Sequence, residues 1–256
     1  MSFIKRRGRL GNQIVMQLAA SIIAEKHNLY IEYENCDAIK AVGIKLFVGE
    51  VRHDKNVVLT DHNYMDILNA DEIDHNISIN NSYFQTKLNS DIIHAYLNTS
   101  EKRLDVMNRN MYKNRYDNNN DVFVHVRLGD VHRWNPGFEY YDGILKKIPS
   151  GTIYVATDTN NHEIIVRLAK KYKNMRLMGP DLGTIFKLGS TCKHVILSYG
   201  TFSAMIGYMA YYSRVYYRAS DPNYRWDHDA ADECEMFSKY ETNVGDWTEV
   251  MGGLGD

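Results

Sequence analysis

Residues 121–130 of the chain, DVFVHVRLGD, decide the fold. Residues 122–126 are mostly β-branched or aromatic, which favours a buried strand, and Gly129 then turns the chain. This stretch carries an imidazole, a guanidinium and a carboxylate: His125, Arg127 and Asp130. Because ligands of open α/β sheets bind at the carboxyl ends of strands, Arg127 is a candidate clamp for a phosphate. An arginine at a strand end also commonly forms a surface ion pair, so this interpretation depends on its context.

Strands and helices alternate downstream of this stretch. Strands are expected at residues 152–156, 175–178, 195–198 and 214–217. Helices are expected between them, at residues 138–147, 161–173, 181–190 and 201–212. Alternation of this kind predicts a parallel sheet with right-handed crossover connections.

The first half of the chain starts with a βαβ-type unit. A strand, a glycine turn, a helix and a second strand are expected at residues 2–7, 8–13, 12–27 and 29–33. The helix places apolar residues four positions apart on one face, as a packed amphipathic helix does. Further strands are expected at residues 56–60 and 77–79, and further helices at 90–97 and 101–113.

Residues 114–120, NRYDNNN, are polar and rich in turn formers, so they are the candidate linker. The sequence therefore predicts an α/β protein with two Rossmann-like lobes, at residues 1–115 and 121–225. The charged segment that follows, residues 226–256, is expected to pack across both lobes.

Composition excludes several classes of protein. The chain has 256 residues and a net charge of −2, which gives no basis for binding nucleic acid or an anionic membrane. No apolar run reaches the length of a membrane span, and the first residues resemble a strand rather than a signal peptide. A soluble, cytoplasmic protein is expected.

The cysteines give no sign of a metal site. Cys36, Cys192 and Cys234 are isolated, no Cys/His pair has zinc spacing, and the odd count argues against a disulfide framework. Residues 227–229, Asp-His-Asp, are interpreted as part of a solvated tail. P-loop, nucleophile-elbow and dinucleotide glycine motifs are missing as well. Neither a metal ion nor a cofactor is expected.

Polar groups follow four of the expected strands. Residues 8–13 and 198–203 offer backbone N–H groups at helix starts, where anions bind readily. Arg127 adds a guanidinium and Asp158 a carboxylate, so the set predicts a phosphate pocket. A carboxylate accepts two N–H bonds from the Watson–Crick edge of guanine, so Asp158 favours that base. Helix capping within residues 198–203, and a turn role for Asp158, remain alternatives.

Five segments, in order, resemble a known group of enzymes. GRLGNQ (8–13) is similar to a G-G-L-G-N-Q turn, SYFQT (82–86) to G-Y-[FW]-Q-S, and HVRLGD (125–130) to HVRRGD. YVATD (154–158) is similar to a strand that ends in an acidic residue, and CKHVILSYGTFS (192–203) to C-x-H-x-I-x-S-N-S-[ST]-F-S. The chain thus resembles the fucosyltransferase superfamily with the HxRRxD-type motif, and most closely its α-1,2-fucosyltransferase family.

The resemblance implies a GT-B-like enzyme whose two Rossmann-like lobes enclose a cleft, with the acceptor on the first lobe and the nucleotide sugar on the second. Arg127 matches the arginine that grips the donor diphosphate. His125 matches the histidine near guanine and ribose, and Asp158 the acidic residue that reads guanine. The other donor-binding positions are Gly8, Gly11 and Asn12 in the first lobe, and Ser198, Thr201, Phe202 and Ser203 in the second.

The implied activity is inverting transfer of L-fucose from GDP-fucose to a hydroxyl of a glycan acceptor, as in glycan biosynthesis, without a metal ion. Arg127 would stabilise the charge on the leaving diphosphate. Asp130 and His132 are the candidates for the general base. The family match favours Asp130, whereas an imidazole is the usual base at neutral pH.

The chain also departs from the family pattern. Leu128 stands where the second motif arginine is expected, Tyr-Gly at residues 199–200 replaces Asn-Ser, and Ala-Met at 204–205 replaces Trp-Trp. The loss of one cation leaves Arg127 to carry more of the phosphate charge and leaves the identity of the sugar open. Two alternatives therefore stand: a transferase that uses another GDP- or UDP-sugar, and a non-catalytic GDP-sugar-binding module.

Overall fold

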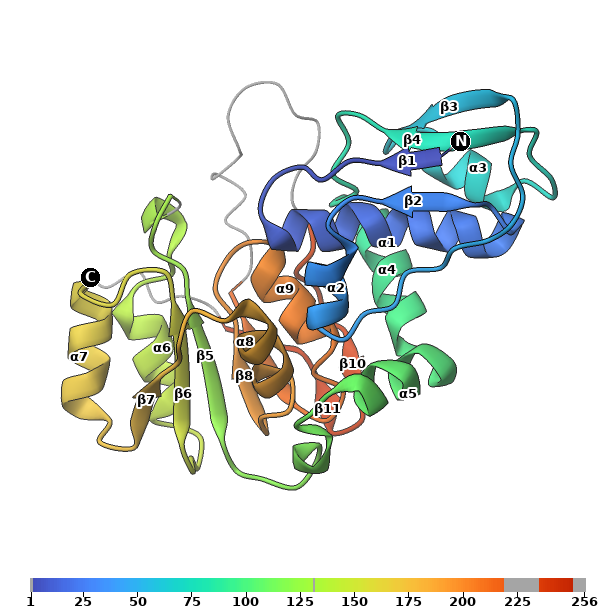
Figure 1. The fold of residues 1–256 in the computed structure, drawn as a ribbon. Coiled ribbons are helices and arrows are strands. Elements are labelled where there is room, and N and C mark those ends of the chain that lie inside the picture. Colours follow the sequence, from blue (N-terminus) through green and yellow to red (C-terminus); the bar gives the residue numbers. More distant parts are fainter. Residues whose placement is uncertain (1, 131, 219–234, 251–256) are drawn as a thin grey trace. The chain divides into compact units, whose positions relative to one another are not determined.

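The computed structural model describes residues 2–130, 132–218 and 235–250 (Figure 1). The chain divides into two compact units: Met1–Lys102 with Trp226–Met236, and Arg103–Arg225 with Phe237–Asp256. Residues 226–234 and 251–256, which belong to the expected tail, lie outside the described residues.

The boundary between the units falls after Lys102, earlier than the linker expected at residues 114–120. Asn110 illustrates the reason, because its Nδ2 donates a 2.9 Å hydrogen bond to the carbonyl oxygen of Lys187. Residues 103–115 thus fold with the second unit through contacts that their own composition does not reveal.

The second unit is built on a six-stranded sheet in which β5 (Val122–Val126) has a neighbour on each side. The strand order is β12-β9-β8-β5-β6-β7, and every pairing in it is parallel. The other strands are β6 (Ile153–Thr157), β7 (Met175–Leu177), β8 (His194–Ile196), β9 (Arg214–Tyr217) and β12 (Thr248–Glu249). The expected parallel α/β sheet is confirmed, and the short edge strand β12 is an addition to it.

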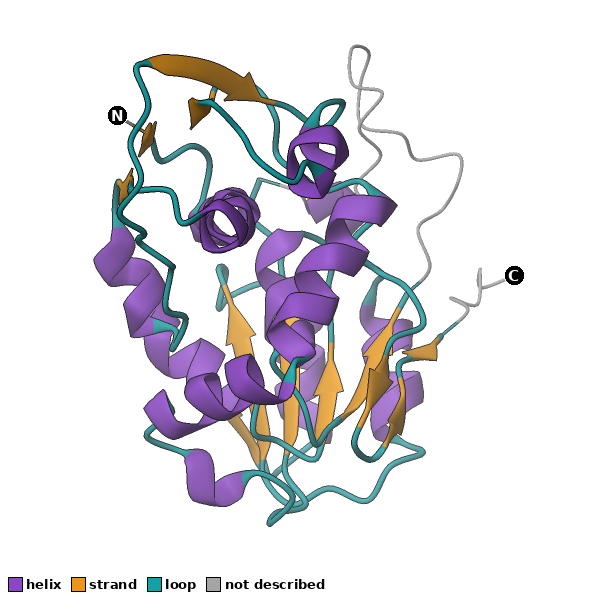
Figure 2. Ribbon diagram, turned by 90° about the vertical axis from the view of Figure 1, so that its right-hand side faces the viewer, coloured by secondary structure: helices purple, strands orange, loops and turns teal. Residues whose placement is uncertain are grey.

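Helices cover both faces of this sheet (Figures 1 and 2). They are α6 (Phe138–Leu145), α7 (Glu163–Lys171), α8 (Leu182–Gly189) and α9 (Thr201–Tyr208). Alternate side chains of β5 point to opposite faces, as in any strand. Val124 and Val126 pack in an apolar core with Tyr141 of α6 and Ile165 of α7.

The other face of β5 meets α8 and α9. Phe123 lies against Gly189 of α8, where a β-carbon would come within 2.9 Å of its ring. The ring centroid of His125 lies 5.5 Å from that of Phe202 in α9. Strand β5 therefore directs His125, and Arg127 two residues later, towards the side of the sheet where α9 begins.

The first unit contains two parallel strand pairs around one long helix. Its strands are β1 (Ser2–Ile4), β2 (Ile31–Tyr33), β3 (Lys55–Leu59) and β4 (His75–Ile79). The N–H of Ile77 donates to Ser2 Oγ at 3.0 Å, which brings β1 beside β4. Helix α1 (Leu10–His27) is buried along most of its length, because three further helices contact it: α2 (Cys36–Ala41), α3 (Tyr64–Asn69) and α4 (Lys87–Asn98).

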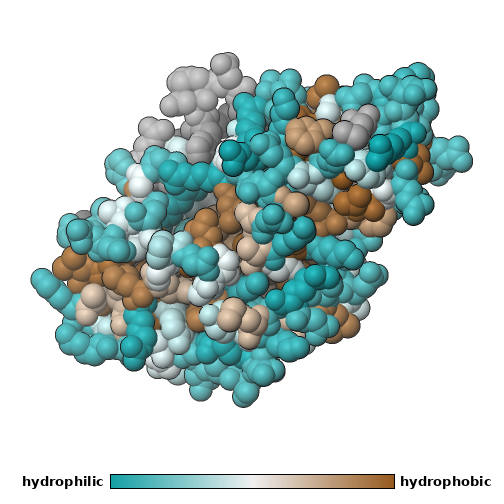
Figure 3. All heavy atoms as spheres, viewed as in Figure 1, coloured by the Kyte–Doolittle hydropathy of each residue, from teal (hydrophilic) through white to brown (hydrophobic). Residues whose placement is uncertain are grey.

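Helix α5 (Ser100–Arg109) contains the boundary between the units. The other elements are short: the 3₁₀ turns Lys113–Arg115 and His132–Trp134, and the hairpin of β10 (Glu241–Thr242) and β11 (Gly245–Asp246). Hydrophilic residues dominate the face drawn in Figure 3, and hydrophobic ones appear there in separate patches. In the part of the chain that the structure describes, no helix combines the length and apolar character needed to cross a lipid bilayer.

Candidate functional site

The guanidinium of Arg127 lies at the carboxyl end of β5. Its side chain is only 17% exposed, and Nη2 pairs with Asp130 Oδ1 at 3.3 Å. The head group also lies beside Gly200, since a β-carbon there would be 3.3 Å from Arg127 Cζ. A partly buried cation is thereby held next to the residue that precedes α9.

The residue at the N-cap position of α9 is a glycine, which has no side chain to cap the helix. Gly200 occupies the N-cap position with φ 101°, and the first turn contains no acidic residue. A helix start bears partial positive charge on its N–H groups, so the guanidinium beside it, although paired with Asp130, adds to a positive region that attracts anions. The combination of Arg127 and this helix start therefore forms a candidate anion site.

Ser198 and Ser203 were expected to bind the donor, but the structure places both hydroxyls inside the protein. Ser198 is 4% exposed, and its Oγ accepts from the N–H of Arg127 at 3.3 Å and from Tyr141 Oη at 3.2 Å. Ser203 is fully buried, and its Oγ accepts from the N–H of Ser198 at 2.9 Å. These bonds join the ends of β5 and β8 to the first turn of α9. Direct contact of either serine with a ligand stays a prediction.

Asn135 is a further member of this network that the sequence did not reveal. Its Nδ2 donates to the carbonyl oxygen of Arg127 and to Tyr141 Oη, both at 3.0 Å. The sequence showed only a loop here, because an asparagine before Pro136 and Gly137 is typical of any turn. Ser198 thus binds the backbone N–H of Arg127, and Asn135 binds its carbonyl oxygen.

Asp158 is exposed at the end of β6 and holds the turn that follows β5. Its Oδ1 accepts from the N–H of Leu128 at 2.8 Å, and its Oδ2 from the N–H of Gly129 at 3.0 Å. The turn role that the sequence left open is thus observed. Each carboxylate oxygen keeps a further lone pair, so recognition of guanine stays a prediction.

His125 is a buried, neutral imidazole. It is 8% exposed, and burial, followed by the charge of Arg127, lowers its pKa to about 4. Nδ1 has no hydrogen-bond partner within the described residues. Phe202 packs against the His125 ring and, with ring centroids 5.0 Å apart, against Phe186 of α8.

The two candidates for the general base lie on the same turn. Asp130 is 48% exposed and paired with Arg127, whereas His132 is exposed and has Nδ1 3.4 Å from the carbonyl oxygen of Gly129. Thr201, the remaining candidate of this unit, is 6% exposed at the first position of α9. The structure brings Arg127, Asp130, Thr201 and Phe202 to one end of the sheet, and their roles stay predictions.

The candidates of the first unit form a turn of their own. Gly8 has φ 67°, and Gln13 Nε2 donates to its carbonyl oxygen at 2.8 Å. Gln85 Nε2 donates to Asn12 Oδ1 at 3.2 Å, so two of the five recognised segments meet here. Gly11 is buried in α1, which begins at Leu10 rather than at residue 12 as expected.

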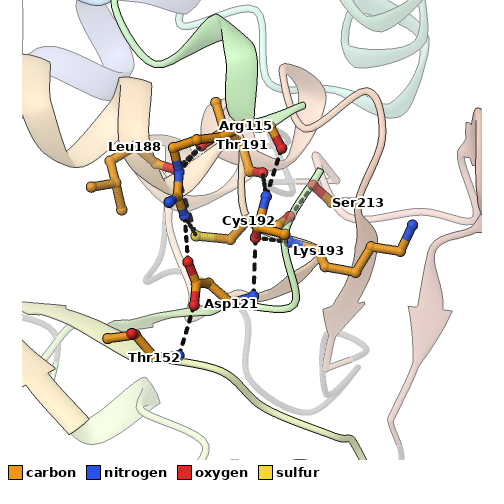
Figure 4. A network of polar contacts seen from close by, with 9 residues as sticks. Arg115, Asp121, Thr152, Leu188, Thr191, Cys192, Lys193 and Ser213 are labelled. Atoms are coloured by element: carbon orange, nitrogen blue, oxygen red, sulfur yellow. Dashed lines mark hydrogen bonds and ion pairs between the residues drawn. The ribbon is translucent and has the colours of Figure 1, made fainter. Parts of the chain in front are cut away.

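A second polar network lies at the amino end of β5 (Figure 4). Asp121 accepts from Arg115 Nη2 at 2.8 Å and from the N–H of Thr152 at 2.7 Å. Cys192 is fully buried beside Arg115, and burial raises the pKa of its thiol to about 12. A thiol of this kind is unreactive, so the network is structural.

No three His, Cys, Asp or Glu side chains gather as a metal site within residues 2–130, 132–218 and 235–250. The Asp-His-Asp triplet at residues 227–229 and Cys234 lie outside the described residues.

Comparisons with known proteins support the fold. No protein-family model and no curated protein sequence matches the chain. Among solved structures it is similar to NodZ α-1,6-fucosyltransferase soaked with GDP-fucose, at 12% identity and a TM-score of 0.51, over 84% of this chain and 94% of that one. It is also similar to fucosyltransferase NodZ from Bradyrhizobium, at 11% identity and a TM-score of 0.50, with the same coverage. The expected GT-B-like α/β fold is confirmed, while membership of the α-1,2 family stays a prediction.

Proposed function

We propose that the chain is a glycosyltransferase that takes its sugar from a GDP-sugar, with GDP-fucose the first candidate, and transfers it to a hydroxyl of a glycan acceptor. The observation that carries the proposal is the Arg127 guanidinium beside Gly200, the N-cap residue of α9. The guanidinium and the helix start are adjacent groups of positive charge, an arrangement that suits a diphosphate. The fold, shared with a protein that was soaked with GDP-fucose, supports this choice of donor.

In the proposed reaction an acceptor oxygen attacks the anomeric carbon from the face opposite the leaving GDP. The bond between that carbon and the β-phosphate oxygen breaks, and the electron pair stays on the phosphate. Arg127 and the N–H groups of α9 stabilise this charge, so no divalent metal is needed. Removal of one such donor typically lowers the rate by a factor of about 10²–10³.

Asp130 is our first candidate for the base that takes the acceptor proton, and His132 is the second. Asp130 matches the family motif and lies on the same turn as Arg127, with a carboxylate 3.3 Å from its guanidinium. A turn that holds both groups would place the base close to the leaving phosphate. His132 is exposed, and its imidazole suits proton transfer at neutral pH.

A second candidate function uses the same fold with another base or sugar. It is favoured by Asp158, whose two oxygens already accept backbone N–H groups of Leu128 and Gly129. If these bonds persist with ligand present, Asp158 has less capacity to select guanine. A GDP- or UDP-sugar would then bind through its diphosphate with little preference for the base.

The test is calorimetric titration of the full chain with GDP, UDP and ADP in EDTA, for wild type and Arg127→Ala. We expect GDP to bind most tightly and Arg127→Ala to weaken binding by about tenfold or more. Arg176→Ala, which removes an exposed arginine of β7, is the matched control and should bind as wild type does. Equal binding of all three nucleotides would favour the second candidate, and binding indifferent to Arg127 would overturn the proposal. Release of fucose from GDP-fucose would then test for catalysis against a binding-only module.

A further inference from the structure

Gly200 lies directly against the guanidinium of Arg127. A β-carbon at residue 200 would overlap Arg127 Nη1 and lie 3.3 Å from Cζ and 3.7 Å from Cδ. Gly200 also has φ 101°, a conformation that side chains of L-residues rarely adopt. The space that the guanidinium occupies therefore exists only because residue 200 has no side chain.

We propose that Gly200 is a positioning residue that holds the Arg127 guanidinium against the start of α9 and thereby sets the geometry of the anion site. The ligand in this inference rests on the proposed function, whereas the contact itself belongs to the folded chain. The atoms that a β-carbon would meet are the far end of a flexible side chain. Such a group moves more easily than the surrounding backbone, so the head group would be the part displaced.

The rest of Arg127 cannot follow its head group. Its N–H donates to Ser198 Oγ at 3.3 Å, and its carbonyl oxygen accepts from Asn135 Nδ2 at 3.0 Å. The guanidinium also pairs with Asp130, whose carboxylate is 48% exposed. A β-carbon at residue 200 would therefore turn the guanidinium away from α9, towards Asp130 and solvent.

The test is a double-mutant cycle of Gly200→Ala and Arg127→Ala, read by calorimetry with GDP in EDTA. Gly200→Ala should lower GDP affinity on the order of tenfold, as the loss of one charge-assisted contact does. In the Arg127→Ala background the same change should have almost no effect, because the displaced group is already gone. In the Arg127→Lys background its effect should be smaller than in wild type, since lysine has no Nη1 to collide.

Gly245→Ala is the control for backbone strain. Gly245 also has positive φ, 139°, in the second unit, but nothing lies within 4 Å of a β-carbon there. Its substitution should lower the melting temperature and leave GDP affinity unchanged. A merely structural role of Gly200 would instead weaken GDP binding equally with and without Arg127, and that outcome would overturn the proposal.

Failure of the proposed function is distinguishable from failure of this inference. If wild type binds no GDP, the positioning role is tested by the side-chain N–H resonances of Arg127, identified by their loss in Arg127→Ala. Gly200→Ala should shift these resonances, and Gly245→Ala should not. Unchanged Arg127 resonances in folded Gly200→Ala would overturn the inference whatever the ligand is.

Discussion

Leu128 stands where the related motif has its second arginine, and its surroundings show why an arginine cannot simply be restored there. Its side chain is 3% exposed and packs in the apolar core with Val126 and Leu145. Leu128→Arg would bury a charge without a partner, so we expect a loss of unfolding free energy on the order of 3 kcal/mol, and no gain in GDP affinity. Urea unfolding and calorimetry measure the two effects, with Leu128→Met as the volume-conserving control. A stable Leu128→Arg protein with tighter GDP binding would contradict this account.

His125 predicts a dependence of stability on pH. Its pKa is lowered from 6.5 to about 4 in the folded chain, so between these values the unfolded chain binds more protons. The contribution of His125 to the free energy of unfolding is therefore fully present above pH 6.5 and is lost as the pH falls towards 4. This contribution is on the order of 3 kcal/mol in total. His94 and His194, whose pKa values are also lowered to about 4, contribute in the same direction.

The contribution of His125 is isolated by comparison with His125→Gln, whose amide does not titrate. The variant should lose less free energy of unfolding than wild type between pH 7 and pH 4. Parallel curves for the two proteins would show that His125 does not gain its proton on unfolding, and would refute the assignment.

At the scale of elements, the long periodic segments were predictable and the short ones were not. Strand β5 and its neighbours follow apolar patterns that need no tertiary information. Strand β12 has two residues, and the segment that contains it is held by Trp247, whose ring fits against Gly207 of α9. Nothing in the local sequence encodes that contact.

The candidate site was likewise predictable only in part. The motif containing Arg127 and the helix start near Gly200 could be identified, because both occur at the ends of predicted strands. The inward hydroxyls of Ser198 and Ser203 could not, since each depends on which rotamer the packed site admits. For the same reason the network of Asn135 and Tyr141 was missed.

The polar network at the amino end of β5 gives a prediction about stability. The Asp121 side chain is 16% exposed and joins Arg115 to the N–H of Thr152, at the start of β6 (Figure 4). Asp121→Ala leaves the half-buried Arg115 guanidinium without its carboxylate partner and should cost about 2–4 kcal/mol of unfolding free energy. Because Arg127 lies at the opposite end of the strand, GDP affinity of the folded variant should match wild type. Chemical denaturation measures the loss of stability, and calorimetry measures GDP affinity. Weaker GDP binding by the folded variant would contradict the prediction that the network at the amino end of β5 does not affect binding.

At the scale of the whole molecule, neither unit is continuous in sequence. Residues 235 and 236 belong to the first unit, where the N–H of Glu235 donates to the carbonyl oxygen of Gln85 at 2.9 Å. Residues 237–250 belong to the second unit, where Trp247 is 2% exposed. Truncation after Arg225 therefore removes contacts from both units, and we expect both to lose protection in hydrogen exchange. Loss confined to one unit would show that the returning segment matters to that unit alone.

Hydrogen exchange with and without GDP tests how far the proposed donor site extends. We expect the ligand to slow exchange at residues 125–130 and 198–203, because a ligand that binds only the folded state stabilises what it touches. At a hundredfold excess over the dissociation constant this stabilisation is about 2.7 kcal/mol. Protection at residues 8–13 is what the sequence resemblance implies, and its absence would confine the proposed donor site to the second unit. Arg127→Ala is the control, since at the same GDP concentration it should lose the protection at all of these segments together. Protection that persisted in this variant would show that GDP binds without the guanidinium from which the proposed function is argued.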